Sequence, residues 1–400
     1  MDDVIVVGAG PGGSAAAHYL AQRGARVTLI DKAHFPRDKT CGDGLTPRAV
    51  AMLQDIGLLD ELLHLGHVVR QFEVFAPNGA RTSAPIRAGS QTPAVPALVV
   101  PRLRLDDALR QRAIASGAAF FPDVHVSELH PEADGVWVIG SSQRASFRRK
   151  AHLAVIATGA STSLLIRMGV LKQQPQVLVA ARAYFEDVRG LGDTWTLRFD
   201  HVPMPGYGWV FPTGSSSANI GVGYFKEQRC ASAVAPFERF IHSPPLRDML
   251  TSAKQAGPVK GFPLRDDFLT APTFAARTLI VGEAAGLVNP LTGEGIDYAL
   301  ESGRIAATHA LAMLHDGDFS TERLHAYDTA LRAHFQALFA FCLTVRRWAM
   351  RPWVLNGLVM LANRRTDLRA RLVDVVLGGA PITGKLTVRR VLKALLTPQQ

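Results

Sequence analysis

The strand–turn–helix unit at the start of the chain places the strongest constraint on the fold. Residues 4–7 are Val-Ile-Val-Val, a run typical of a buried strand, and residues 14–20 have the composition of a helix. Between them, Gly8, Gly10 and Gly13 have the spacing of a dinucleotide-binding turn. In such a turn the first glycine allows the tight bend and the second lets the backbone approach a pyrophosphate. The third lets the helix pack closely on the strand.

A second strand and an acidic residue strengthen this interpretation. Residues 26–30 are Arg-Val-Thr-Leu-Ile and end in Asp31, at the position where a carboxylate binds the ribose hydroxyls of an adenosine. The N-terminus of the preceding helix adds unpaired N–H groups and a partial positive charge, both of which favour an anion. The sequence therefore predicts a bound dinucleotide at the edge of a parallel sheet.

Length and cysteine content narrow the class of protein. A chain of 400 residues, 48% of them hydrophobic, predicts two closely joined units with a sizeable core. Cys41, Cys230 and Cys342 are far apart in sequence, which argues against a disulfide framework, a zinc site or an iron–sulfur cluster. We predict no metal site. The chain passes from Met1 directly into the first strand without a signal segment, so we expect a cytoplasmic protein.

The basic residues are concentrated at the C-terminal end. Residues 331–400 contain twelve Lys or Arg and two acids, which accounts for the whole net charge of +10. Two apolar runs, 335–345 and 353–362, lie among these arginines, and each is shorter than the ~20 residues that a membrane-spanning helix needs. Either they form a helical cap over the core, or they lie on an anionic membrane surface. No basic–aromatic module indicates nucleic-acid binding.

The middle of the chain changes to a β pattern. Asn78-Gly79 is a hairpin signal between residues 72–75 and 81–83, and it predicts the start of an antiparallel unit. Further along, Tyr207, Trp209 and Phe211 alternate, so on a strand they share one face. They form either ordinary sheet core or the wall of a site for an apolar ligand or a flavin.

A second glycine-rich turn follows a strand at residues 278–281. It contains Gly282-Glu283 and, before a predicted helix, Gly293 and Gly295. The N–H groups at the start of that helix are suited to stabilising negative charge on a reduced flavin ring. Two dinucleotide-type turns about 270 residues apart fit one large two-ended cofactor, for which FAD is a better match than NAD.

These motifs together resemble the geranylgeranyl reductase family of FAD proteins. The resemblance rests on four motifs: Gly8–Gly13 with Asp31, Cys41-Gly-Asp-Gly-Leu-Thr-Pro-Arg48, Tyr207-x-Trp-x-Phe-Pro212 with Gly221-x-Gly223, and Asn289-Pro-Leu-Thr-Gly-Glu-Gly-Ile-Asp297. The likeness covers about residues 1–310, and it is closest to bacterial members that reduce one double bond in the isoprenoid tail of menaquinone.

The resemblance implies an α/β fold with a Rossmann-like FAD-binding domain of the glutathione reductase and aromatic hydroxylase type. That domain would be discontinuous, comprising residues 1–67, 97–175 and 270–315. An inserted antiparallel-sheet substrate domain would comprise residues 68–96 and 176–269, and a basic helical region residues 316–400.

The resemblance also implies roles for individual residues. Those that would hold the cofactor are Gly8, Gly10, Gly13, Asp31, Lys32, Cys41, Gly42, Arg102, Gly159, Gly282, Glu283, Pro290, Gly293, Gly295 and Ile296. Tyr207, Trp209 and Phe211 would contact substrate. Cys41, ranked first as proton donor because of its loop, is a catalytic candidate together with Tyr207 and Trp209. The sequence departs from the family pattern at two places. It has Gly282-Glu283 where many relatives have Gly-Asp, and Ala-Thr-Gly159 where relatives often have Asp-Gly.

The implied activity is reduction of a carbon–carbon double bond in the prenyl chain of a menaquinone or geranylgeranyl lipid. The reductant would be NAD(P)H or a ferredoxin-type donor. The main alternative is an FAD-dependent monooxygenase that hydroxylates an aromatic or other natural product. Halogenation is disfavoured because no lysine lies between Lys39 and Lys150. An iron–sulfur quinone oxidoreductase is disfavoured because this sequence lacks the cysteines that its cluster needs. A non-catalytic flavin-binding protein is the remaining alternative.

Overall fold

The computed structural model describes residues 1–400 apart from 89–93, 143–144, 176–177, 226–232 and 378–400. Cys230, Val177 and the last part of the basic C-terminal region therefore lie outside the described residues.

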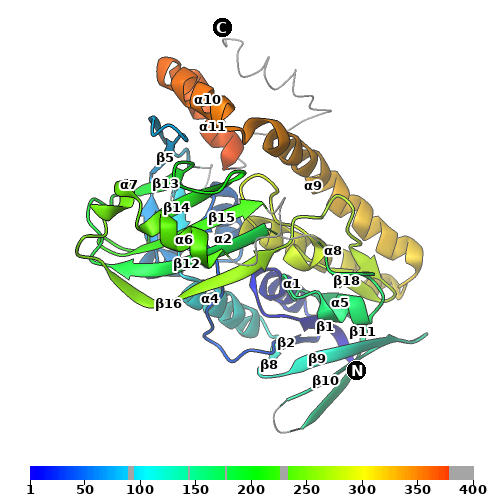
Figure 1. Ribbon diagram of the computed structural model, residues 1–400. Helices are drawn as coiled ribbons and strands as arrows, with labels where there is room; N and C mark the ends of the chain where they lie inside the picture. The colour runs from blue at the N-terminus through cyan, green and yellow to red at the C-terminus, as the bar shows by residue number, and fades with distance from the viewer. Residues whose placement is uncertain (89–93, 143–144, 176–177, 226–232, 378–400) are drawn as a thin grey trace.

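The predicted parallel sheet forms the centre of the first unit (Figure 1). Its strand order is β17-β18-β11-β1-β2-β8, and the pairs among β18, β11, β1, β2 and β8 are all parallel. The strands are β1 (Asp2–Val7), β2 (Val27–Ile30), β8 (Ala119–Phe121), β11 (Ser146–Ile156), β17 (Phe274–Ala275) and β18 (Thr278–Ile280), and the antiparallel extension is β9 (His125–Pro131) and β10 (Val136–Ser141).

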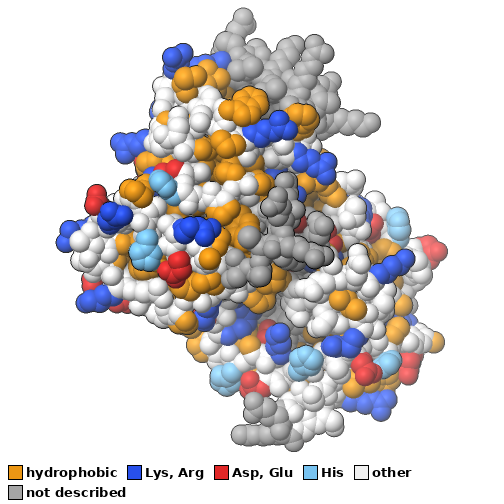
Figure 2. Space-filling view, in the orientation of Figure 1, with side chains coloured by type: hydrophobic (Ala, Val, Ile, Leu, Met, Phe, Trp, Pro, Cys, Tyr) orange, Lys and Arg blue, Asp and Glu red, His pale blue; other side chains and the backbone are white. Residues whose placement is uncertain are grey.

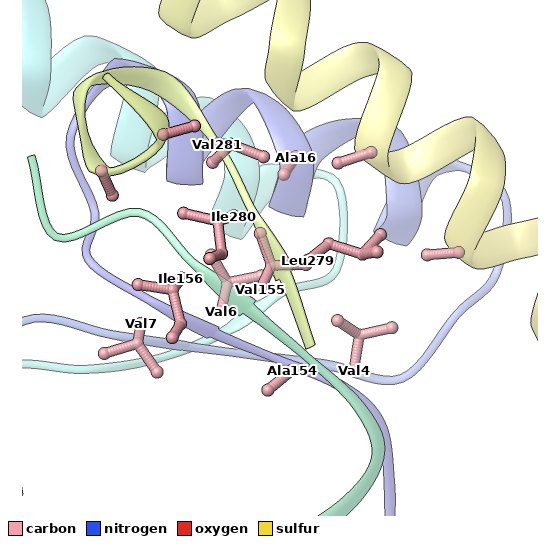
Figure 3. Close-up of a cluster of buried hydrophobic side chains, with 14 of the residues drawn as sticks. Val4, Val6, Val7, Ala16, Ala154, Val155, Ile156, Leu279, Ile280 and Val281 are labelled. Atoms are coloured by element: carbon pink, nitrogen blue, oxygen red, sulfur yellow. The ribbon is translucent and has the colours of Figure 1, made fainter. Parts of the chain in front are cut away.

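Two helices from opposite ends of the sequence pack together on this sheet. Helix α1 (Pro11–Gln22) lies against α8 (Ile296–Asp316), and the close approach needs glycine, because a Cβ at Gly303 would lie 2.5 Å from the Gly12 carbonyl oxygen. The central strands carry fully buried Val, Ile and Leu side chains, seen in Figure 3 beneath both helices. This packing brings the N-terminal turn and the second glycine-rich turn to the same edge of the sheet.

The second unit is a seven-stranded sheet in the order β16-β12-β15-β14-β13-β5-β6. The hairpin predicted at Asn78-Gly79 is confirmed: β5 (Gln71–Phe75) and β6 (Arg81–Pro85) pair antiparallel. One pair departs from the expected antiparallel arrangement, because β5 runs parallel to β13. The other strands are β12 (Leu178–Glu186), β13 (Thr194–Arg198), β14 (Gly206–Pro212), β15 (Ala218–Phe225) and β16 (Lys254–Leu264).

A small sheet and several short helices join the two units. The sheet has the order β3-β7-β4, formed by β3 (Gly44–Leu45), β7 (Ala97–Val99) and β4 (His67–Val69). After the cysteine loop the sequence predicts one helix through about Leu65, and this prediction is wrong. Helix α2 (Pro47–Asp55) ends before Gly57, whose φ of 76° breaks the helix, and α3 (Leu59–Leu65) follows. The remaining helices are α4 (Arg102–Ala115), α5 (Ser163–Arg167), α6 (Val234–Ile241), α7 (Pro244–Arg247) and the 3₁₀ turn Gly282–Ala285.

The C-terminal apolar runs have different environments. Helix α9 (Thr321–Ala349) buries Phe335 and Phe339 in the core of the first unit, so the first run does form a helical cap. Helices α10 (Pro352–Arg364) and α11 (Thr366–Val376) instead pack over β6, and α10 exposes Trp353 and Met360. Among the described residues, no helix combines the length and apolarity needed to cross a bilayer.

Candidate FAD and substrate site

A cavity of about 510 Å³ runs between the carboxyl edge of the parallel sheet and the inner face of the seven-stranded sheet. It brings together residues that are up to 370 positions apart in the sequence, from Val7 to Leu377. The predicted site residues that line it are Gly8, Gly10, Asp31, Lys32, Cys41, Gly42, Arg102, Gly159, Tyr207, Trp209, Phe211, Gly282, Glu283, Gly293, Gly295 and Ile296. Gly13 and Pro290 are not in its lining. Gly13 packs under the turn, where a Cβ would overlap the Gly8 carbonyl. The Pro290 carbonyl accepts a hydrogen bond from Arg346 at 3.0 Å.

The glycine turn is held by the acid that follows β2. Asp31 Oδ2 accepts the Ala9 backbone N–H at 2.7 Å, and its Oδ1 accepts the Ala33 N–H at 2.8 Å. These bonds align the end of β2 with the start of α1, where Pro11 occupies the first turn and lacks an N–H group. A Cβ at Gly10 would lie 3.3 Å from Arg37, so only a bare backbone leaves room there for a pyrophosphate.

Two arginines share one buried carboxylate at this end of the cavity. Arg102, at the start of α4, donates two hydrogen bonds to Asp106 at 2.6 and 2.7 Å, and Arg37 pairs with the same group at 2.9 Å. Asp106 is fully buried and Arg102 nearly so. One carboxylate against two guanidiniums leaves a net positive charge beside the glycine turn, which suits the phosphates of a dinucleotide.

An ion pair spans the opposite wall. Lys39 Nζ lies 2.7 Å from Glu283 Oε2, and the Arg265 backbone N–H donates to Glu283 Oε1 at 3.2 Å. Gly159 lies directly beside this pair, since a Cβ there would be 3.4 Å from the lysine nitrogen and 3.5 Å from the glutamate oxygen. Glu283 and the Ala157-Thr158-Gly159 segment, the two places where the sequence departs from the family pattern, therefore adjoin each other.

The second glycine-rich turn presents the N-terminus of α8 to the cavity. Gly293 has a φ of 70°, and Glu294 then folds back so that its Oε1 accepts the N–H groups of Gly295 and Ile296 at 3.0 and 2.9 Å. Burial and the nearby Asp297 carboxylate raise the pKa of Glu294. Sequence reasoning did not single out Glu294, although its place between two glycines in a helix-opening turn was a usable signal.

One asparagine ties the cysteine loop to the aromatic strand. The Asn219 amide nitrogen donates to the Cys41 carbonyl at 2.7 Å and to Asp43 Oδ2 at 2.8 Å, and its Oδ1 accepts the Trp209 indole N–H at 2.9 Å. Tyr184 also donates to Asp43 Oδ2, at 2.6 Å. Asp43 is fully buried with a φ of 65°, and burial raises its pKa to about 6.

Sequence reasoning also missed this network. The only signal for Asn219 is a polar residue in an otherwise apolar strand, and nothing in the sequence connects it to a loop 178 residues earlier. Asp43 stands in the quoted cysteine motif but was given no role.

The aromatic residues form the cavity wall opposite the cysteine loop. The rings of Tyr207, Trp209 and Phe211 follow one another with centroids 6.1 and 6.3 Å apart, as their alternation on β14 predicted. Gly42 lies against Phe211, where a Cβ would be 3.0 Å from the ring. The Tyr207 hydroxyl donates to the Thr292 carbonyl, so its proton is held by the second glycine-rich turn.

Cys41 lines the same cavity. Burial raises the pKa of its thiol to about 11, so at neutral pH it is a protonated thiol and not a thiolate. A buried, protonated thiol is not suited to nucleophilic attack or metal binding.

The profile of a known family, described as FAD binding domain, matches residues 1–342. Over 388 residues, the chain is 33% identical to a menaquinone reductase of Mycolicibacterium smegmatis, covering 94% of this chain and 91% of that one. The chain belongs to the geranylgeranyl reductase family of FAD-dependent oxidoreductases.

Another relative agrees with this placement, and solved structures share the fold. A digeranylgeranylglycerophospholipid reductase of Methanopyrus kandleri is 28% identical, covering 84% of this chain and 88% of that one. The fold matches a geranylgeranyl bacteriochlorophyll reductase-like protein of Thermoplasma acidophilum, with a TM-score of 0.77, 23% identity and coverage of 98% and 95%. It also matches a flavin-dependent brominase, with a TM-score of 0.78, 20% identity and 98% of each chain covered.

The residues around the cavity fit the FAD of this reductase family at both ends. The glycine turn with Asp31 and the Arg102–Arg37 pair suits an adenosine and its phosphates. At the start of α8 the Gly295 and Ile296 N–H groups are already held by Glu294, and the positive end of the helix dipole is what suits the electron-rich edge of a flavin ring. The aromatic wall suits a flat or apolar neighbour.

Proposed function

We propose that this protein reduces a carbon–carbon double bond in a prenyl chain, either the tail of a menaquinone or a geranylgeranyl lipid. The observation that carries the proposal is the wall of Tyr207, Trp209 and Phe211, because it lines the same cavity as both glycine-rich turns. A chain of isoprene units has no polar group to bind, so apolar and aromatic walls are what it requires. The names of the relatives, which concern menaquinone and geranylgeranyl lipids, support the same substrate class.

Each side of the site has a distinct task in this reaction. When bound, reduced FAD would supply the hydride. The protein would position the alkene, exclude water from the site and supply a proton. The Asn219 bonds hold the cysteine loop against the aromatic wall, and Cys41 lines the cavity in which the alkene would lie. The raised pKa of Cys41 keeps its proton available at neutral pH. Two hydrogens are gained by the alkene: the hydride, and the proton from this side of the cavity.

The test is the mass of the product. Purified protein is supplied with FAD, dithionite and a prenylated naphthoquinone under nitrogen, and the lipid is analysed by mass spectrometry. We expect the tail to gain two hydrogens. A product that forms only in air and gains one oxygen atom would identify a monooxygenase and reject this proposal.

The physiological reductant is a separate part of the proposal. We propose NAD(P)H or a ferredoxin-type protein as the donor. Ala157-Thr158-Gly159 stands where relatives often have a pair tied to nicotinamide use in hydroxylases, so this segment does not select between the two donors. Stopped-flow bleaching of bound FAD by NADPH, compared with reduced ferredoxin, distinguishes the two.

We also propose that the protein works at the inner face of the membrane as a peripheral protein. Trp348 at the end of α9 and Trp353 on α10 are 58% and 70% exposed, next to Arg347 and Arg351. On the face shown in Figure 2, hydrophobic and basic side chains gather over the region where Figure 1 places α10. Aromatic and basic residues together favour the interface of an anionic leaflet, at ~1 kcal/mol per basic residue near the surface. Co-sedimentation with anionic liposomes that falls with salt is the expected result.

A further inference from the structure

A second cavity lies beyond Tyr207, under the C-terminal helices. It has a volume of about 160 Å³, and we call it the second chamber. Strands β5, β6 and β13 form its floor, and the end of α9, α10 and α11 form its roof. The residues that line it include Val74, Ala84, Val345, Leu355, Leu358, Val359, Ala362, Leu372 and Val373.

The second chamber adjoins the FAD and substrate cavity. The two share five lining residues, Phe72, Leu197, Tyr207, Thr292 and Val376. At this boundary the Tyr207 hydroxyl is bonded to the Thr292 carbonyl, so the tyrosine ring is fixed between the two spaces. A ligand too long for the main cavity would therefore pass along the ring of Tyr207 to reach the second chamber.

The size and lining of the second chamber select what it can hold. A dry apolar cavity of ~150 Å³ takes a benzene molecule, so this one has room for about one five-carbon isoprene unit. Its lining is almost wholly apolar, and the Tyr207 hydroxyl at its edge is already engaged. The Thr82 hydroxyl, which lines the second chamber and has no hydrogen-bond partner among the described residues, could serve at most one of the two carbonyls of a quinone ring placed there, whereas a prenyl unit has no hydrogen bond to lose.

We propose that the second chamber binds the prenyl chain on the far side of the reacting double bond, with Val359 and Ala84 as residues that determine specificity for chain length. The inference rests on the proposed function. Val359 enters from α10 in the roof and Ala84 from β6 in the floor; their exposures are 5% and 3%. Anchoring one unit there would fix which part of a long tail lies beside Cys41.

The test fills the second chamber from either wall. Val359→Phe and Ala84→Leu each add bulk inside it. Met360→Phe makes a similar change one residue away, on the outer face of α10 where the side chain is 54% exposed. FAD content is measured for each variant to check that the main cavity is intact. Geranylgeraniol and the single-unit alcohol dimethylallyl alcohol are then titrated by calorimetry.

We expect both filling variants to bind geranylgeraniol at least about tenfold more weakly than the wild type, while Met360→Phe binds it unchanged. All four proteins should bind dimethylallyl alcohol alike, because a single unit fits in the main cavity. Unchanged geranylgeraniol binding in Val359→Phe and Ala84→Leu would overturn the inference. If the wild type bound geranylgeraniol and the filling variants did not, but no double bond were reduced, the second chamber would stand and the proposed function would fall.

Discussion

The indole ring of Trp209 occupies the space above Gly221 on the neighbouring strand. The two residues are paired in register between β14 and β15, and a Cβ at Gly221 would overlap the indole ring. Gly223, two positions along the same strand, is different, because a Cβ there would lie 3.7 Å from the same ring, an ordinary contact. The aromatic wall therefore depends on glycine at one of these positions and not at the other.

Gly221→Ala should destabilise the protein by about 1–3 kcal/mol, because Trp209 is buried and a displaced indole ring would lose its hydrogen bond to Asn219. Gly223→Ala should change stability by no more than about 0.5 kcal/mol. Thermal unfolding of both variants with FAD bound is the measurement. Equal shifts in Tm would mean that the overlap at Gly221 is relieved without cost.

Cys41→Ala should lower kcat by about a hundredfold if the thiol gives the proton. Because burial raises the pKa of Cys41 to about 11, the wild-type rate should show no loss from thiol ionisation between about pH 6 and about pH 9. Cys342→Ala is the control, since Cys342 is buried on α9 and lines neither cavity. Unchanged turnover by Cys41→Ala would assign the proton to another group.

Asp43 should make the fold less stable as the pH rises. Its folded-state pKa of about 6 lies above the ordinary value of 3.8, so its contribution is fully present below about pH 4 and is lost as the pH rises through about 6. This shift in pKa corresponds to a change of at most about 3 kcal/mol in the free energy of unfolding.

Asp43→Asn keeps the shape of the side chain and tolerates the positive φ, and it removes the charge. The variant should therefore have a higher Tm than the wild type at about pH 8 and nearly the same Tm at about pH 4. Chemical or thermal unfolding across that range gives the comparison. A Tm difference that does not change with pH would show that Asp43 is not the titrating group.

Replacing both Trp348 and Trp353 by Ala should weaken binding to anionic vesicles by about tenfold, because these exposed rings would be the apolar part of the membrane contact. Leu103→Ala is the control, since Leu103 is 45% exposed on α4. The FAD content should stay constant in all of these proteins. Vesicle binding that is the same with and without the two tryptophans would show that these parts of α9 and α10 do not contact the membrane.

The parts of the site that come from short segments were predictable. Gly8, Gly10 and Asp31 lie within one strand–turn–helix–strand unit, where local spacing fixes the geometry, and all three line the cavity as expected. Tyr207, Trp209 and Phe211 share a face because a strand alternates its side chains. The FAD family assignment followed from such local patterns. The roles of the individual site residues and the domain boundaries stay predictions.

Contacts between distant segments were not predictable. The Asn219 bonds to the cysteine loop join two units of the fold, and hydrogen-bonding groups far apart in sequence meet only when the sheets pack. The pairing of Lys39 with Glu283 likewise explains a departure from the family pattern that the sequence could only record. The break between α2 and α3 at Gly57 was not predicted, because glycine also occurs inside continuous helices at a cost of only about 1 kcal/mol.

The sequence by itself determined the FAD family and the presence of two glycine-rich turns and an aromatic strand, because strand period, helix period and glycine spacing are local properties. Only the tertiary structure decided that α10 and α11 close over β6 and leave an apolar chamber beyond Tyr207. A cavity is the space left over when side chains from several elements pack, so no single stretch of sequence carries it.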